Sequence, residues 1–287
     1  MATIDAISFG GKDSQTHDGQ GFLPFLILLD VSESMAFDLT KKPYAPPGPI
    51  HFWNEHLPNF IEMLKSNPSS KSQVHTKVVT FNHQIDASGS WLLPDDWEAQ
   101  EYTASGTTAL NEACYVGVAQ LVEKIDALKA EHGEGVRVLR PTMMIVSDGL
   151  PDQRDHDDFH EKAKRRLDRM VSDAKFTVVS VSLGSGDNAE YVNQYLKALT
   201  PRESNALVMD DPNDLESLFR FASEMIDDVY LSSPPPSVDE EYVDEGEDIS
   251  RAVANSTTIA PQRGGGNFAN TAAILAAADD ELDSLTS

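Results

Sequence analysis

The sequence predicts an α/β fold: a doubly wound, mostly parallel β-sheet flanked by helices, with one antiparallel strand at its edge. Two observations predict it. Apolar, β-branched runs alternate along the chain with segments of helical periodicity, an order typical of parallel sheets with helices on both faces. The runs are also continuous rather than alternating with polar residues, which indicates strands that are covered on both faces.

Each expected strand is a short apolar run followed by polar or turn-forming residues. The runs are "FLILLD" (25–30), "HTKVVTF" (75–81), "MMIVSD" (143–148), "FTVVSVSL" (176–183) and "ALVMD" (206–210). A sixth segment, "QIDASGSWLL" (84–93), alternates more strongly between apolar and polar residues. That alternation favours an edge strand or a hairpin partner.

The expected helices lie between these runs and have their apolar residues on one side. They span 50–67, 108–133, 158–174, 188–199 and 212–231. The second ends at Gly133, the residue type most common just after a helix. In the fifth, Asp211 or Asn213 is suited to cap the first turn.

Composition predicts one folded unit with polar ends. Residues 1–22 are polar and glycine-rich, as in a flexible arm, and the domain is expected over 23–231. The segment 232–270 contains proline, glycine and acidic runs with little to bury, which indicates a disordered linker. Residues 271–287 regain helix-forming residues and make either an unfolded end or a short helix that docks on a partner.

The charge balance excludes some partners. With 22 basic and 47 acidic residues, the formal net charge is −25, so we expect neither nucleic acid nor an anionic membrane to bind. The single cysteine, Cys114, cannot form an intramolecular disulfide, and its place in the helical pattern favours a buried, unreactive side chain. No signal-peptide pattern opens the sequence, so we expect a cytoplasmic protein.

Polar residues follow two of the expected strands at the points where those strands end. In "LLDVSES", Asp30 ends the first strand and Ser32 and Ser34 follow it, while Asp148 ends another strand in "MMIVSDGLPDQ". In open parallel sheets, ligands gather at the carboxyl ends of the strands. We therefore expect these side chains to share one edge of the sheet with Thr107 or Thr108, which open a helix.

Carboxylate and hydroxyl oxygens are the ligands that hard divalent cations bind, whereas softer metals recruit Cys or His. Two aspartates would roughly balance the charge of such an ion. Neutral hydroxyls would leave it able to accept a carboxylate from outside. The expected cofactor is Mg²⁺, with Mn²⁺ or Ca²⁺ as alternatives.

The motifs resemble those of the von Willebrand factor A (vWA) family and its metal-ion-dependent adhesion site. They are D-x-S-x-S at 30–34, a threonine opening a helix, and S-D-G at 147–149. The resemblance implies that Ser32, Ser34 and Thr108 bind the metal directly and that Asp30 and Asp148 bind it directly or through water. Thr107 and Asn111 depart from the family pattern, which commonly has glycine at both positions, so the threonine ligand is Thr108 or Thr107.

The resemblance also implies a function without catalysis. "LILLDVSESM" and "GTTALNEA" are similar to bacterial cytosolic vWA proteins, including members associated with tellurite resistance and stress. Such members imply a metal-dependent adaptor whose protein partner presents an Asp or Glu, with kinase, phosphatase or ATPase neighbours. The alternative is a Mg²⁺-dependent phosphoryl hydrolase, which is disfavoured because the three loops contain no lysine or histidine.

One further pattern offers a different metal. His156 and His160 are spaced to share a helix face and could bind zinc. No motif supplies a third ligand, so an exposed helix start is favoured over a zinc site.

Overall fold

A computed structural model describes most of the central part of the chain. The described residues are 21–67, 73–133, 136–172, 176–183, 189–209 and 215–232. The first 20 residues of the expected arm, and all of the expected linker and C-terminal segment after residue 232, lie outside them. So do the expected capping residues Asp211 and Asn213.

The described strands form one mixed sheet in the order β3-β2-β1-β5-β6-β7, with β4 paired to the start of β1. Their bounds are β1 Gly21–Asp30, β2 Val74–Phe81, β3 Ile85–Asp86, β4 Arg137–Val138, β5 Thr142–Ser147, β6 Thr177–Ser182 and β7 Ala206–Val208. All neighbours pair in parallel except β2 and β3, which are antiparallel. The predicted fold class is confirmed, including its antiparallel edge.

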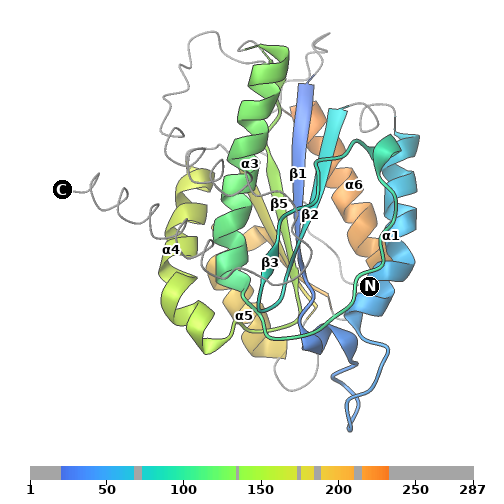
Figure 1. Cartoon of the computed structure of the whole chain (residues 1–287), viewed down its shortest axis with the longest axis vertical. Helices are drawn as coiled ribbons and strands as arrows, with labels where there is room; N and C mark the ends of the chain where they lie inside the picture. Colours follow the sequence, from blue (N-terminus) through green and yellow to red (C-terminus); the bar gives the residue numbers. More distant parts are fainter. Residues whose placement is uncertain are drawn as a thin grey trace, which may run out of the picture.

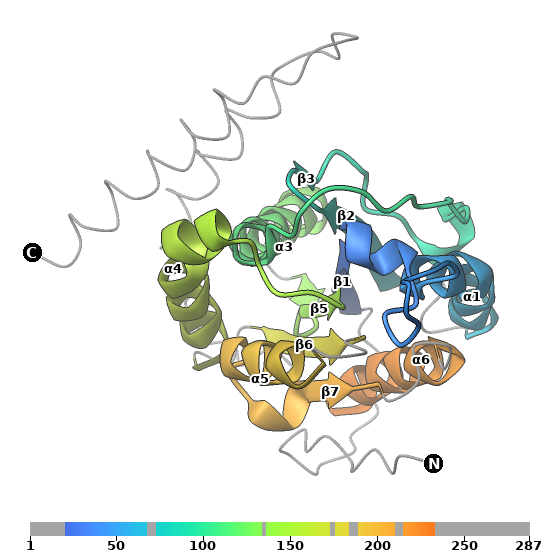
Figure 2. The same ribbon diagram turned by 90° about the horizontal axis from the view of Figure 1, so that it is seen from below.

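Helices cover both faces of the sheet, as Figures 1 and 2 show. Their bounds are α1 Pro49–Ser66, α3 Leu110–His132, α4 Gln153–Ser172, α5 Ala189–Leu199 and α6 Leu215–Ser232. α1 and α6 pack on one face, and α3, α4 and α5 pack on the other. The sheet therefore has a separate apolar core on each side.

Strand β1 joins the two cores, because all ten of its residues are buried. Leu23, Phe25 and their alternate neighbours face α1 and α6, whereas Leu26 and Leu28 face α3. The chain goes from β1 to β2 on one side and later to β5 on the other. The order of the strands thus reverses between β1 and β5, the place where ligands bind in open α/β sheets.

Four elements differ most from the sequence-based expectation. Strand β1 begins at Gly21 rather than residue 25, so the last two residues of the expected arm belong to a buried strand. Helix α4 begins at Gln153 rather than residue 158, because the Asp152 carboxylate accepts a hydrogen bond from the backbone N–H of Asp155 (2.9 Å) and so caps the helix earlier. Strand β4 was not expected. Within 84–93, only Ile85–Asp86 forms a strand, and a single bridge joins Leu92 to Thr76.

Candidate metal centre

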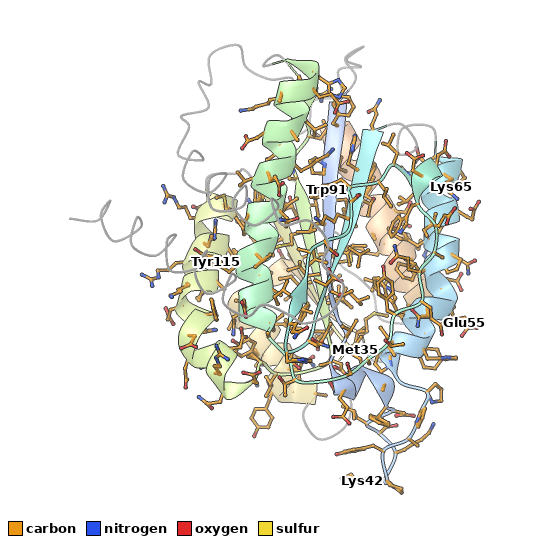
Figure 3. The ribbon with its side chains drawn as sticks, in the orientation of Figure 1. Met35, Lys42, Glu55, Lys65, Trp91 and Tyr115 are labelled. Atoms are coloured by element: carbon orange, nitrogen blue, oxygen red, sulfur yellow. The ribbon has the colours of Figure 1, made fainter. Side chains whose placement is uncertain are left out.

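A buried polar cluster lies where β1 and β5 end, at the lower end of the sheet in Figure 1 and toward the viewer in Figure 2. The 3₁₀ helix η1 (Glu33–Ala36) follows β1 there, and its Met35 is labelled in Figure 3. The cluster contains every residue that the sequence predicted as a metal ligand: Asp30, Ser32, Ser34, Thr108 and Asp148. Ser34 is partly exposed, and the other four are buried.

Hydrogen bonds join β1, η1 and the end of β5. The backbone N–H of Ser32 donates to Oδ1 of Asp30 (2.8 Å), and the hydroxyls of Ser32 and Ser34 lie 3.1 Å apart. The Ser34 hydroxyl donates to Oδ1 of Asp148 (2.7 Å), a residue 114 positions away in the chain. The two aspartates therefore lie beside the same pair of serines.

Gly149 shows how closely the oxygens converge. A Cβ atom placed on this glycine would lie 3.3 Å from Oγ1 of Thr108, 3.5 Å from Oγ of Ser34 and 3.9 Å from Oδ2 of Asp30. Three oxygens, one from the Thr108 loop and two from the end of β1 and the adjoining η1, thus lie within 4 Å of one point. The absence of a side chain at Gly149 keeps that point open.

The two carboxyl groups are in an unfavourable setting on their own. Burial raises the pKa of Asp30, against hydrogen bonds from Ser147 and Ser32 that lower it. Burial, and then the charge of Asp30, raise the pKa of Asp148. In addition, Oδ2 of Asp148 is buried and has no hydrogen-bond partner among the described residues. A cation would supply the missing partner and reduce the repulsion.

The oxygen cluster fits a hard divalent cation. Its two carboxylates and three hydroxyls are the ligand types that Mg²⁺ binds, often with retained water. No group of three or more His, Cys, Asp and Glu side chains gathers as a metal site among the described residues. The fit therefore depends on the hydroxyl groups, and the five candidate ligands include none of the His and Cys side chains of a typical zinc site.

Comparison with known proteins gives a fold. No family model matches the chain, and no curated protein sequence matches it significantly. Among solved structures, the chain is similar to a mutant of the PilB minor pilin from Streptococcus sanguinis, with 12% identity and a TM-score of 0.51 over 77% of this chain and 65% of the pilin. It is also similar to the vWF domain of the type V pili tip protein Mfa5 from Porphyromonas gingivalis, with 10% identity and a TM-score of 0.50 over 76% of this chain and 99% of that domain. The pilus adhesin SpaC from Lactobacillus rhamnosus GG matches at 12% identity with a TM-score of 0.52, over 75% of this chain and 31% of the adhesin.

The chain has a vWA fold. Identities of 10–12% show this likeness of architecture and nothing finer. The chain spans less than two thirds of the pilin and less than a third of the adhesin. None of these three proteins supports the tellurite-resistance branch that the motifs suggested. No helix within the described residues is long and apolar enough to cross a bilayer.

Within this vWA fold, the two candidate threonines have different surroundings. The hydroxyl of Thr107 is exposed and donates to Oδ2 of Asp152 (2.8 Å). That of Thr108 belongs to a buried residue and lies beside Ser34 and Gly149. The geometry therefore favours Thr108 as the ligand.

Sequence reasoning missed two residues that hold the cluster in place. The buried hydroxyl of Ser147 donates to Oδ2 of Asp30 and joins the ends of β5 and β1. Asp155 accepts hydrogen bonds from the first turn of α3, just after Thr108. Ser147 was visible as part of S-D-G, but no local signal linked Asp155 to a helix 44 residues earlier.

A histidine also lies closer to the cluster than the sequence indicated. A Cβ atom on Gly106, whose φ is +77°, would clash with Nδ1 of His83, so this ring packs on the loop that carries Thr108. His83 comes from the turn between β2 and β3. The loops themselves contain no histidine, but the fold brings one against them.

The alternative zinc pair gains no third ligand among the described residues. The rings of His156 and His160 stack with their centroids 4.8 Å apart, and Nδ1 of His160 lies 2.7 Å from the hydroxyl of Tyr195. His160 thus belongs to a hydrogen-bond network, and the pair packs as adjacent rings on one helix face. Cys114 is buried, which raises the pKa of its thiol and agrees with the unreactive role expected for it.

Proposed function

We propose that this vWA-fold domain is a divalent-cation-dependent protein-interaction module. It holds the ion with Asp30, Ser32, Ser34, Thr108 and Asp148, and binds an acidic side chain of a protein partner. The observation that carries the proposal is the convergence at Gly149, where oxygens of Thr108, Ser34 and Asp30 surround one point. The unpartnered Oδ2 of Asp148 supports it.

The two aspartates and the three hydroxyl residues contribute differently to the proposed site. Asp30 and Asp148 supply two negative charges from the ends of β1 and β5, which balance a divalent ion. The hydroxyls of Ser32, Ser34 and Thr108 add neutral oxygens. When bound, the ion supplies an electrophilic position that accepts a carboxylate from the partner. The role of the chain is to place the oxygens and to expose that position at the sheet's edge.

We propose Mg²⁺ as the resident ion, because small hydroxyl and carboxylate oxygens suit its short, near-octahedral coordination. Mn²⁺ and Ca²⁺ are the alternatives. Titration calorimetry with each of the three ions distinguishes them. Tighter binding of Ca²⁺ than of Mg²⁺ would contradict this choice of ion without affecting the proposed function.

The proposal extends to a cytoplasmic adaptor without catalytic activity, acting in a bacterial stress or defence complex. Motif resemblance supports the process, and the partner's identity tests it. The absence of catalysis is tested with an aryl phosphate substrate, with and without Mg²⁺. We expect no turnover above that of the Asp30→Ala variant, and Mg²⁺-dependent release of phosphate would contradict the proposal.

The main experiment is affinity capture from cells in Mg²⁺ or EDTA, using the wild type and an Asp30→Ala plus Ser32→Ala variant. The chain offers a matched control, Asp86→Ala plus Ser88→Ala. In that exposed pair, as in the site, the serine backbone N–H donates to an aspartate two residues earlier (3.0 Å against 2.8 Å).

We expect one partner to be retained by the wild type in Mg²⁺ and by the control. The same partner should be lost in EDTA and with the site variant. A partner that persists in EDTA and with the site variant would contradict the proposal, because its binding would need neither the ion nor the two ligands.

A further inference from the structure

Helix α3 begins without a capping side chain of its own. Its N-cap residue is Ala109, which has no side-chain oxygen to accept from the free N–H groups of the first turn. Those groups bond instead to Asp155 on α4. The backbone N–H of Asn111 donates to Oδ2 (2.8 Å), and that of Glu112 donates to Oδ1 (2.8 Å). One carboxylate thus caps α3 from a different helix.

The first turn of α4 is itself attached to the residue proposed as a metal ligand. The backbone N–H of Asp152 donates to the carbonyl oxygen of Thr108 (2.9 Å). The Asp152 carboxylate accepts from the N–H of Asp155 (2.9 Å). Asp152 therefore holds the backbone of Thr108, and Asp155 caps α3, the helix that begins two residues after Thr108.

Asn111 reinforces the link between the helices. Its side-chain amide donates to Oδ2 of Asp155 (2.9 Å), and its Oδ1 accepts from the hydroxyl of Tyr195 on α5 (2.9 Å). Asn111 is fully buried and Asp155 nearly so. Both polar side chains have partners, so together they fix the first turn of α3 in one position.

We propose that Asp155 is a positioning residue for the metal centre, acting together with Asn111. By tying the first turn of α3 to that of α4, it keeps Oγ1 of Thr108 beside Ser34 and Gly149. The inference rests on the proposed function, since it concerns the same ion. A small ion with strict octahedral geometry is sensitive to a ligand displaced by a fraction of an ångström.

The test measures Mn²⁺ binding to the full chain by electron paramagnetic resonance, with the thermal midpoint recorded for each variant. We expect Asp155→Ala to weaken Mn²⁺ binding about tenfold or more, within the ~10–100-fold range of outer-shell partners. Asp155→Asn keeps one acceptor oxygen and should lose less. It is also the variant to use if Asp155→Ala does not fold.

Two controls separate positioning from general weakening. Asp157→Ala makes the same charge change at an exposed site on the same helix, and should leave Mn²⁺ affinity unchanged. Leu64→Ala makes a cavity in the core under α1. This end of α1, which Lys65 marks in Figure 3, lies far from η1. It should lower the thermal midpoint and leave the affinity of the folded protein unchanged.

If wild type binds Mn²⁺ and both Asp155 variants bind it as tightly as wild type does, the inference is overturned and the proposed function stands. If wild type binds no divalent ion, both are overturned. Leu64→Ala and Asp155→Ala could lower the thermal midpoint equally and also weaken Mn²⁺ binding equally. The loss of affinity would then follow from lost stability, and the inference would again be overturned.

Discussion

Near each end of β1, a neighbouring strand carries a buried polar atom without a hydrogen-bond partner among the described residues, and the two atoms have different surroundings. At the carboxyl end it is Oδ2 of Asp148, which lies among hydroxyl and carboxylate oxygens. At the amino end it is Nε2 of His75 on the neighbouring strand β2. The His75 ring packs edge-on against Phe22, at 5.7 Å between centroids, and Phe22 stacks on His132 at 4.5 Å.

The comparison shows that an unpartnered polar atom does not define a site by itself. Around His75 the neighbours are aromatic rings and, farther off, the positive charge of Lys124, so burial disfavours the charged imidazole and the ring packs as a neutral aromatic. Around Asp148, oxygens from η1, β1 and the Thr108 loop converge on one point. Several oxygen ligands near one point distinguish a candidate metal site from a single polar atom that is buried by packing alone.

The strongest way to break this comparison is to remove the unpartnered carboxylate. Asp148→Asn keeps the size of the side chain and an oxygen for the Ser34 hydroxyl, but removes the charge. We expect Mg²⁺ affinity to fall more than about 100-fold, beyond the effect of an outer-shell partner. The metal-free variant should unfold at the same temperature as the wild type or higher, because a buried charge is lost.

Calorimetric titration and thermal unfolding in EDTA measure the two effects, and His75→Phe is the control at the other end of β1. It should bind Mg²⁺ like the wild type. Unchanged Mg²⁺ affinity in Asp148→Asn would show that the unpartnered oxygen has no role in binding.

A smaller effect is expected from filling the point of convergence. In Gly149→Ala the new methyl group would lie 3.3 Å from Oγ1 of Thr108, so this oxygen must shift by a few tenths of an ångström, and 3.5 Å from Oγ of Ser34, an ordinary contact distance. We expect a loss of Mg²⁺ affinity of about tenfold, as for other perturbations of ligand geometry.

Gly133→Ala is the matched control, because no described atom lies within 4 Å of a Cβ there, while its φ of +89° is unfavourable for alanine. It should lower stability by about 1 kcal/mol without changing Mg²⁺ affinity. Equal affinity in Gly149→Ala and Gly133→Ala would mean that the space at Gly149 is not used.

Most of the fold, and the gathering of the candidate ligands at one edge of the sheet, could be predicted because their signals are local. Continuous apolar runs identified the strands, and the position of Asp30, Ser32 and Asp148 at strand ends placed them at one edge. Parallel strands bring their carboxyl ends together whatever the intervening sequence. The geometry at Ser34 and Gly149 agrees with that expectation.

The remaining features depend on contacts between distant segments. Thr107 and Thr108 are adjacent and chemically identical. The fold distinguishes them, because the chain turns at Gly106 and the Thr107 hydroxyl donates a hydrogen bond to Asp152. Asp155 looks like part of a solvated acidic helix start, yet it is buried beneath α3. A cap supplied across 44 residues leaves no periodic pattern in the sequence.

The smallest predicted effect tests the amino end of β1. Burial lowers the pKa of His75 to about 4, so the folded protein binds a proton there less readily than the unfolded chain, whose histidine titrates near 6.5. The stabilising contribution of neutral His75 is complete above pH 6.5 and is lost as the pH falls from 6.5 toward 4. Because the ring is only half-buried, we expect about 1 kcal/mol between pH 7 and pH 5, well below the full value of the shift.

His75→Phe keeps a ring against Phe22 and removes the titration. Urea unfolding of both proteins in EDTA, at pH 7 and pH 5, should show that the wild type loses about 1 kcal/mol more than the variant on acidification. Subtracting the two proteins cancels every group that they share, including Asp30 and Asp148. An equal loss of unfolding free energy in both proteins would contradict the prediction, because His75 would then contribute nothing to the pH dependence of stability. The two ends of β1 would then differ in ligand binding alone.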